Sequence, residues 1–156
     1  MVKINEKAPA ISLPDQNGRI RTLQSFSGKK TVIYFYSKDN TSGCTAQALG
    51  YAALYGKFTE AGAEVVGVSR DTVQSHVKFK EKHGLPFVLL SDPDMEMIKA
   101  YGVYGEKKLY GKTSFGTVRS TFIIDESGTV VSARTKVNSK TDPDETLRIL
   151  LSLETK

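Results

Sequence analysis

The sequence predicts an α/β fold: a three-layer α/β/α sandwich around a mixed central sheet, preceded by an N-terminal hairpin. In the middle of the chain, patterns typical of buried strands alternate with patterns typical of helices. This alternation favours parallel strands joined by right-handed crossovers. Two later strands separated by a turn add antiparallel pairing. The chain has 156 residues and no internal repeat or linker, so we expect one domain spanning residues 1–156.

The first elements are a hairpin, a buried strand and a helix. Residues 11–27 hold a turn signal, PDQNG, between extended pieces, which predicts a β-hairpin. Residues 31–36 form a continuous β-branched and aromatic run that predicts a buried central strand. After a polar loop, apolar residues recur at spacings of three and four, which predicts a helix ending near Gly62: Cys44, Ala48, Tyr51, Ala52, Tyr55 and Phe58.

Two further strands follow, each with its own helix. Residues 64–69 predict a second buried strand, and Asp71 or Thr72 can cap the helix after it. Gly84 is expected to stop that helix. Residues 87–90 predict a third strand, and a helix is expected near residues 94–101.

The last third combines a loop, a strand pair and a helix. Residues 102–116 are rich in glycine and lysine, and we expect a long loop there. Residues 120–124 and 129–133 predict strands joined by the turn DESG. Thr141 or Asp142 is expected to cap a final helix whose inward-facing residues are Leu147, Leu150 and Leu151.

Composition and charge exclude several classes of protein. The net charge is +5, from 22 basic and 17 acidic side chains, and the basic residues are scattered. Nucleic-acid binding requires a clustered basic face with stacking aromatics, which the sequence lacks. Residues 1–13 contain no long apolar run, so we expect neither a signal peptide nor a membrane helix. A cytoplasmic protein is expected, because a free thiol persists in a reducing compartment.

Cys44 is the candidate reactive group. It follows a buried strand and a short loop at the first turn of a helix, where Thr41 or Ser42 can act as the cap. The unpaired N–H groups of a helix N-terminus favour an anion, so the pKa of the Cys44 thiol should fall. Because Cys44 is the only cysteine, it can form neither an internal disulfide nor a cysteine-rich zinc site. From these residues alone, an inert buried cysteine remains an alternative.

The surrounding residues resemble a known family. The segment YSKDNTSGCT, residues 36–45, looks like the active-site loop of peroxiredoxins, specifically of the bacterioferritin-comigratory or peroxiredoxin Q subfamily. The similarity extends over nearly the whole chain, and the resemblance implies a thioredoxin-like fold. The other matching segments are GVS at 67–69 with Asp71, Ser75, His76 and Phe79, then GLPF at 84–87, LSDP at 90–93, AYGV at 100–103, YGK at 110–112 and RSTFIID at 119–125.

The resemblance also implies a site and a reaction. Cys44 and Thr41 match the family's motif, and Arg119 matches its distant arginine. These positions imply that the Cys44 thiolate attacks a hydroperoxide and becomes a sulfenic acid, with Thr41 positioning the peroxide. Arg119 would stabilise the thiolate and the charge that moves onto the leaving oxygen. Ser37 and Gly43 would line the substrate pocket, with the N–H groups of Gly43 and Cys44 facing the peroxide. No cofactor or metal is expected.

This sequence departs from the family's pattern in two respects. Ser37 and Ser42 stand where the family or subfamily has prolines, and the serine at 37 could leave the thiol more open to water. Leu49 occupies the position at which many relatives carry a resolving cysteine. The sulfenic acid must then be resolved by an outside thiol, such as thioredoxin, glutaredoxin or a small thiol. The subfamily includes monomers and homodimers, and the sequence does not choose between them.

Other functions fit less well. A disulfide reductase needs a second cysteine three residues away, the glutathione-peroxidase-like family uses a tryptophan, and Cys-x5-Arg phosphatases need arginine where Gly50 stands. A redox sensor that transfers oxidation to one protein remains an alternative. Neither His76 nor His83 is tied to an orienting acid by the sequence, and His76 is expected in the core.

Overall fold

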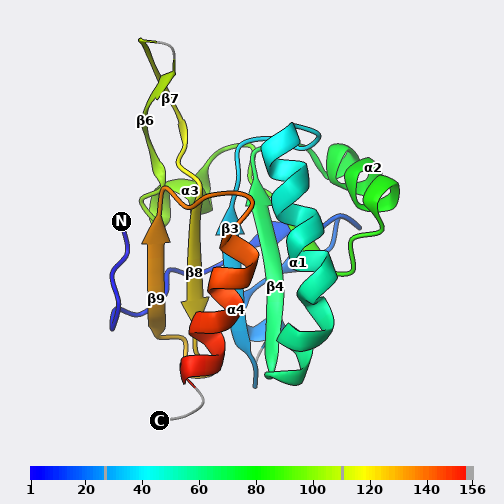
Figure 1. Ribbon diagram of the computed structural model, residues 1–156, viewed down its shortest axis with the longest axis vertical. Coiled ribbons are helices and arrows are strands. Elements are labelled where there is room, and N and C mark those ends of the chain that lie inside the picture. The colour runs from blue at the N-terminus through cyan, green and yellow to red at the C-terminus, as the bar shows by residue number, and fades with distance from the viewer. Residues whose placement is uncertain (27, 110, 154–156) are drawn as a thin grey trace.

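A five-stranded mixed sheet forms the centre of the protein (Figure 1). The computed structural model describes residues 1–26, 28–109 and 111–153. The strand order is β5-β4-β3-β8-β9, in which β3 pairs parallel with β4 and antiparallel with β8. This confirms the expected mixed sheet. The strands are β3 (Lys30–Phe35), β4 (Ala63–Ser69), β5 (Val88–Ser91), β8 (Ser120–Ile124) and β9 (Val130–Thr135).

The helices lie on both faces of this sheet and complete the predicted sandwich. Helices α1 (Ser42–Glu60), α2 (Val73–His83) and α4 (Asp142–Leu153) contribute to one hydrophobic cluster. Helix α3 (Glu96–Ala100) and residues of the N-terminal segment form a second cluster on the opposite face. Within the described ranges, no helix is long and apolar enough to cross a membrane.

The two clusters meet at β3, whose side chains alternate between them. Val32 and Tyr34 face the α1 side, whereas Ile33 and Phe35 face the α3 side. All four are completely buried. A strand covered on both faces must be apolar at every position, which explains the continuous run in the sequence.

Several local predictions are confirmed. The N-terminal hairpin exists, although its strands β1 (Leu13–Pro14) and β2 (Ile20–Arg21) are short and lead into a 3₁₀ helix, η1 (Leu23–Phe26). Thr72, rather than Asp71, caps α2 by accepting a hydrogen bond from the Ser75 N–H at 3.1 Å. Gly84 ends α2 in the left-handed conformation, with φ of 61°. Such a conformation favours glycine because it has no Cβ.

The predicted loop at 102–116 is wrong. Strands β6 (Tyr104–Leu109) and β7 (Lys112–Thr117) form an antiparallel hairpin that projects from the end of the molecule where α1 begins (Figure 1). Four successive residues of β7, 112–115, are exposed, so this stretch lacks the alternation of a half-buried strand. Backbone pairing holds it together, and the stacked rings of Tyr104 and Phe115 add a cross-strand contact.

One prediction for α4 fails. Leu147 and Leu150 are buried, but Leu151 is 46% exposed because it lies on the outer face of the helix. Of the two expected caps, Thr141 directly precedes the helix, which begins at Asp142. The Asp142 carboxylate is fully buried and accepts hydrogen bonds from Gln47 and Tyr51 of α1.

Two glycines of α1 should respond oppositely to alanine. A Cβ at Gly50 would lie 2.7 Å from Cγ of Pro143 in α4, whereas a Cβ at Gly56 would meet nothing within 4 Å. We expect Gly56→Ala to raise the free energy of unfolding by about 0.5–1 kcal/mol, through helix propensity. Gly50→Ala should lower it by about 1–2 kcal/mol, since overpacking outweighs the same propensity gain. Urea unfolding of both variants checks this, and equal stabilisation would contradict the close α1–α4 packing.

Candidate active site

Cys44 lies in the first turn of α1, directly beyond the carboxyl end of β3. Thr41 is the N-cap, with extended backbone angles of −77° and 153°, and its hydroxyl oxygen accepts from the Cys44 N–H at 3.4 Å. The Cys44 N–H is thus directed at the Thr41 hydroxyl oxygen. The side chain of Cys44 points into the core, and the residue is only 1% exposed.

Arg119 reaches the cysteine from the neighbouring strand. It immediately precedes β8, and the register pairs Ser120 of β8 with Phe35, the last residue of β3. Because the two strands are antiparallel, the start of β8 lies beside the loop that leads to Cys44. The Nη2 atom of Arg119 donates to Cys44 Sγ at 3.3 Å. Residues 75 positions apart are thus in direct contact.

The surroundings of Cys44 favour its thiolate. Burial is the largest single influence and by itself raises the pKa of the thiol. The Thr41 hydroxyl, the Lys38 backbone N–H and the charge and hydrogen bond of Arg119 together outweigh it, so the pKa falls below its ordinary value. Polar groups and positive charge next to a thiol stabilise its anion, which is why the pKa falls despite burial.

Gly43 and Ser37 border the same region. A Cβ at Gly43 would lie 3.4 Å from both Arg119 Nη2 and Ser139 Oγ, which is closer than ordinary contact. Glycine therefore leaves room for the guanidinium beside the sulfur. Ser37 is partly buried and stands at the start of the loop between β3 and α1.

A buried polar network holds the Arg119 guanidinium in place. The sequence did not reveal this network. The Nη1 atom of Arg119 donates to Gln47 Oε1 at 2.6 Å, and Gln47 Nε2 donates to Asp142 Oδ2 at 2.9 Å. Asp142 also accepts from Thr121, and it pairs with Arg134 at 3.0 Å. The available signal was Gln47 itself, a polar residue one turn after Cys44 on the apolar face of α1.

Comparison with known proteins identifies the family of this chain. The model of the AhpC/TSA family matches residues 4–133. The chain belongs to this family. Peroxiredoxin Bcp of Bacillus subtilis is 39% identical over 155 residues, which is 99% of each chain. Peroxiredoxin Bcp of Xanthomonas campestris is 44% identical over 133 residues, covering 85% of this chain and 83% of the relative.

Solved structures of similar proteins share the fold. The bacterioferritin comigratory protein of Xanthomonas campestris superposes with a TM-score of 0.85 at 42% identity, covering 91% of this chain and 90% of that one. A cysteine-to-serine variant of PrxQ from Xylella fastidiosa superposes with a TM-score of 0.89 at 32% identity. The match covers 99% of this chain and 98% of that one. The thioredoxin-like peroxiredoxin fold is thereby confirmed, and the chain is a thiol-dependent peroxidase of the Bcp or peroxiredoxin Q kind.

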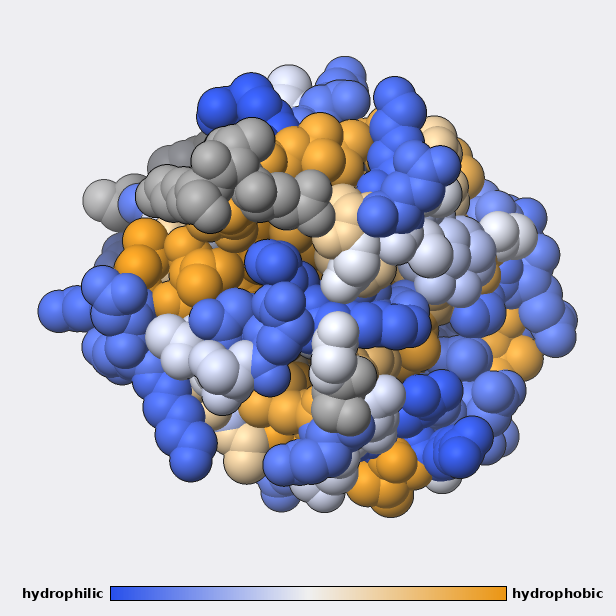
Figure 2. All heavy atoms as spheres, turned by 90° about the horizontal axis from the view of Figure 1, so that it is seen from below, coloured by the Kyte–Doolittle hydropathy of each residue, from blue (hydrophilic) through white to orange (hydrophobic). Residues whose placement is uncertain are grey.

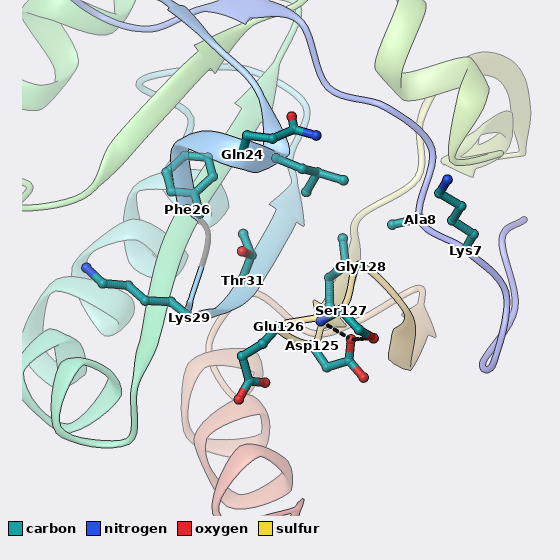
Figure 3. A pocket seen from close by; sticks show the side chains of 12 residues that line it. Lys7, Ala8, Gln24, Phe26, Lys29, Thr31, Asp125, Glu126, Ser127 and Gly128 are labelled. Carbon is teal, nitrogen blue, oxygen red and sulfur yellow. Dashed lines mark hydrogen bonds between the residues drawn. The ribbon is translucent and has the colours of Figure 1, made fainter.

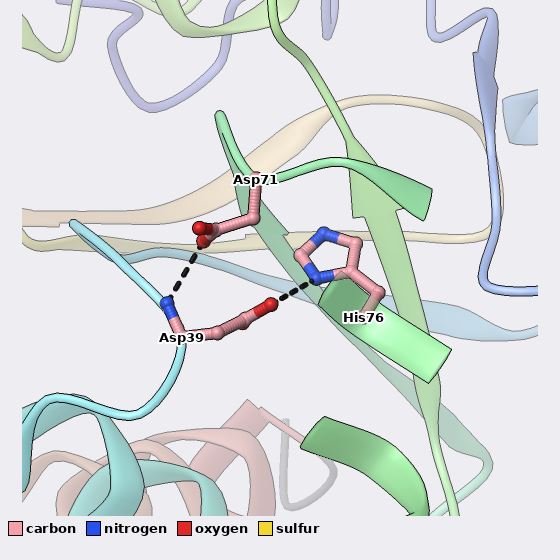
Figure 4. A group of neighbouring side chains, drawn as sticks. All are labelled: Asp39, Asp71 and His76. Carbon is pink, nitrogen blue, oxygen red and sulfur yellow. Dashed lines mark hydrogen bonds and ion pairs between the residues drawn. The ribbon is translucent and has the colours of Figure 1, made fainter. Parts of the chain in front are cut away.

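A second polar cluster of this peroxiredoxin lies behind the active-site loop (Figure 4). His76 is fully buried, as expected, but its Nδ1 lies 2.8 Å from Asp39 Oδ2, a contact that the sequence did not indicate. Asp71 Oδ2 accepts from the Asp39 backbone N–H at 2.8 Å. Asp39, Asp71 and His76 also satisfy the spacing of metal ligands. However, their facing atoms are in direct hydrogen-bond contact with each other, so the cluster is a hydrogen-bond network.

A pocket at the other end of the sheet is remote from Cys44 (Figure 3). It is lined by Phe26 of η1, Thr31 near the start of β3 and the turn at residues 125–128. Since Cys44 lies beyond the end of β3, the length of that strand separates the two places. Figure 2 shows the molecule from this lower end, where hydrophilic side chains surround smaller hydrophobic areas.

Removing the guanidinium should raise the pKa of Cys44. In Arg119→Ala the thiol loses a hydrogen bond and a positive charge, so a smaller fraction is thiolate at neutral pH. We expect the pH profile of iodoacetamide alkylation to move to higher pH, and the peroxide reaction at pH 7 to slow about 10²-fold. Arg148→Ala is the matched control, because Arg148 is exposed and pairs with Glu145. An unchanged alkylation profile in Arg119→Ala would contradict the contact seen here.

Proposed function

We propose that Cys44, Thr41 and Arg119 are the catalytic residues of this peroxidase, and that Ser37 and Gly43 border the bound peroxide. The observation that carries this proposal is the 3.3 Å contact between the guanidinium and the only sulfur nucleophile of the chain. A thiolate that is buried, lowered in pKa and next to a fixed cation is suited to attack an electrophilic oxygen.

In the first half-reaction, the Cys44 thiolate attacks the terminal oxygen of a hydroperoxide. An S–O bond forms as the O–O bond breaks, and the leaving oxygen takes a proton and departs as water or an alcohol. Negative charge moves from the sulfur toward the leaving oxygen. Arg119 carries a fixed positive charge along that path, and the Thr41 hydroxyl can donate to the peroxide. Cys44 ends as a sulfenic acid.

In the second half-reaction, an external thiol attacks the sulfenic sulfur. Water leaves, a mixed disulfide forms, and a second thiol releases Cys44 in its reduced form. An internal disulfide is excluded because the chain has one cysteine. Leu49, at the position of the resolving cysteine of many relatives, lies on α1 and is 43% exposed. Thioredoxin, glutaredoxin or a small thiol would serve as the reductant.

The substrates proposed are hydrogen peroxide and organic hydroperoxides. The related Xanthomonas campestris protein is described by its alkyl peroxide reduction activity, which supports the organic class. We also propose that residues 1–156 act as one domain, as a monomer or homodimer, in the cytoplasm. Cys44 would be its redox-active centre.

The intact mass of the reduced protein, measured within seconds of adding one equivalent of hydrogen peroxide, tests this chemistry. We expect a gain of one oxygen that added thiol reverses and that Cys44→Ser lacks. With excess peroxide and thiol, sustained consumption is expected, and Cys44→Ser should reduce it to background. A single stoichiometric oxidation without turnover would instead favour a redox sensor, and no mass gain would contradict Cys44 as the peroxidatic residue.

A further inference from the structure

The loop between β3 and α1 contributes two of the three groups that lower the pKa of Cys44. These are the Lys38 backbone N–H and the Thr41 hydroxyl. The Thr41 hydroxyl also contacts the Lys38 carbonyl at 3.1 Å, so the two residues hold one another. Lys38 and Thr41 are both exposed. The position of their donors must therefore be fixed from elsewhere.

Asp39 is the buried residue that anchors this exposed loop. Its backbone N–H donates to Asp71 Oδ2 at 2.8 Å, and its Oδ1 accepts from the Tyr36 hydroxyl at 2.6 Å. Its Oδ2 accepts from the Ser75 hydroxyl at 2.8 Å and contacts His76 Nδ1 at the same distance. Asp39 thus ties the loop to Tyr36 directly after β3, to Asp71 before α2 and to α2 itself.

Both ring nitrogens of His76 face groups that accept hydrogen bonds. Its Nδ1 lies against the Asp39 carboxylate, and its Nε2 lies 2.9 Å from the Leu90 carbonyl oxygen. Neither a carboxylate nor a carbonyl can donate, so a ring that bonds to both groups at once carries a proton on each nitrogen. Burial would raise the pKa of Asp39, but the His76 hydrogen bond and charge, with the Tyr36 and Ser75 hydroxyls, lower it overall. Asp39 is therefore a carboxylate that accepts from three side chains.

We propose that Asp39 and His76 form a buried ion pair that fixes the segment from Lys38 to Thr41 beside Cys44, whose backbone N–H donates to Thr41 Oγ1 at 3.4 Å. Both are positioning residues, since neither is within reach of the sulfur in the contacts described. The inference rests on the function proposed for Cys44 and deepens it. Two oppositely charged groups without solvent exposure hold each other in one geometry, because separating them would leave an uncompensated buried charge. Because Asp39 belongs to the loop, fixing its side chain also restricts the movement of the loop backbone.

Two variants test the pair, one at each of its members. A control substitution lies on α2, the helix that carries His76. His76→Gln keeps a hydrogen-bonding side chain but removes the charge, and Asp39→Asn keeps the shape but removes the carboxylate. His83→Gln is the matched control, since His83 lies at the end of α2 and contacts the Phe79 ring instead of the loop. The readouts are the pH profile of Cys44 alkylation by iodoacetamide, the rate with hydrogen peroxide, and thermal unfolding.

The expected result is specific to the thiol. In His76→Gln and Asp39→Asn the alkylation profile moves to higher pH, and the peroxide reaction at pH 7 slows tenfold or more. His83→Gln matches the wild type. If His76→Gln and Asp39→Asn are both less stable but keep the wild-type alkylation profile and peroxide rate, the pair is purely structural and the proposal is overturned. If the wild-type thiol itself shows no lowered pKa and no peroxide reaction, the proposed function fails instead.

A measurement on the unaltered protein covers the case in which the variants do not fold. In the reduced wild type, the ¹⁵N shifts of His76 should show both ring nitrogens protonated at pH 7. His83, which is partly exposed, is the internal reference. A ring with an unprotonated nitrogen at that pH would remove the ion pair, and with it the proposal.

Discussion

The contact between Arg119 and the Cys44 sulfur is the interaction on which the proposed chemistry depends, and the antiparallel pairing of β3 with β8 makes it possible. The end of β3 leads to the cysteine, and the start of β8 follows the arginine. Pairing Phe35 with Ser120 therefore brings the two side chains to the same edge of the sheet. A buried thiol alone would have a raised pKa. With the guanidinium and the loop donors in place, the anion is favoured instead.

Two buried polar networks hold this arrangement from opposite sides. Gln47 bridges Arg119 to Asp142, because its amide oxygen can accept from the guanidinium while its amide nitrogen donates to the carboxylate. A glutamate could not make both bonds. On the other side, Asp39 and His76 hold the loop. Buried polar groups are costly unless each finds a partner, and in both networks the partners come from separate elements of the fold.

Most of the fold could be predicted because its elements have strong local patterns. The uniform apolar run of β3 reflects burial on both faces, and the glycine after α2 reflects the left-handed conformation of its C-cap. The failures have a shared cause, namely that solvent exposure leaves little trace in sequence. Residues 112–115 of β7 are all exposed, and Leu151 is an apolar residue on the outer face of α4.

The sequence by itself determined that a single thiol stands at a helix N-terminus after a buried strand, and that no second cysteine can resolve it. These are local facts, set by spacing, capping and composition. Only the tertiary structure decided which distant groups surround that thiol. Arg119, Gln47 and Asp142 meet through the strand register and the packing of α4 on α1, and His76 meets Asp39 through the position of α2. Side-chain contacts between separate elements depend on how those elements pack, and no local pattern encodes them.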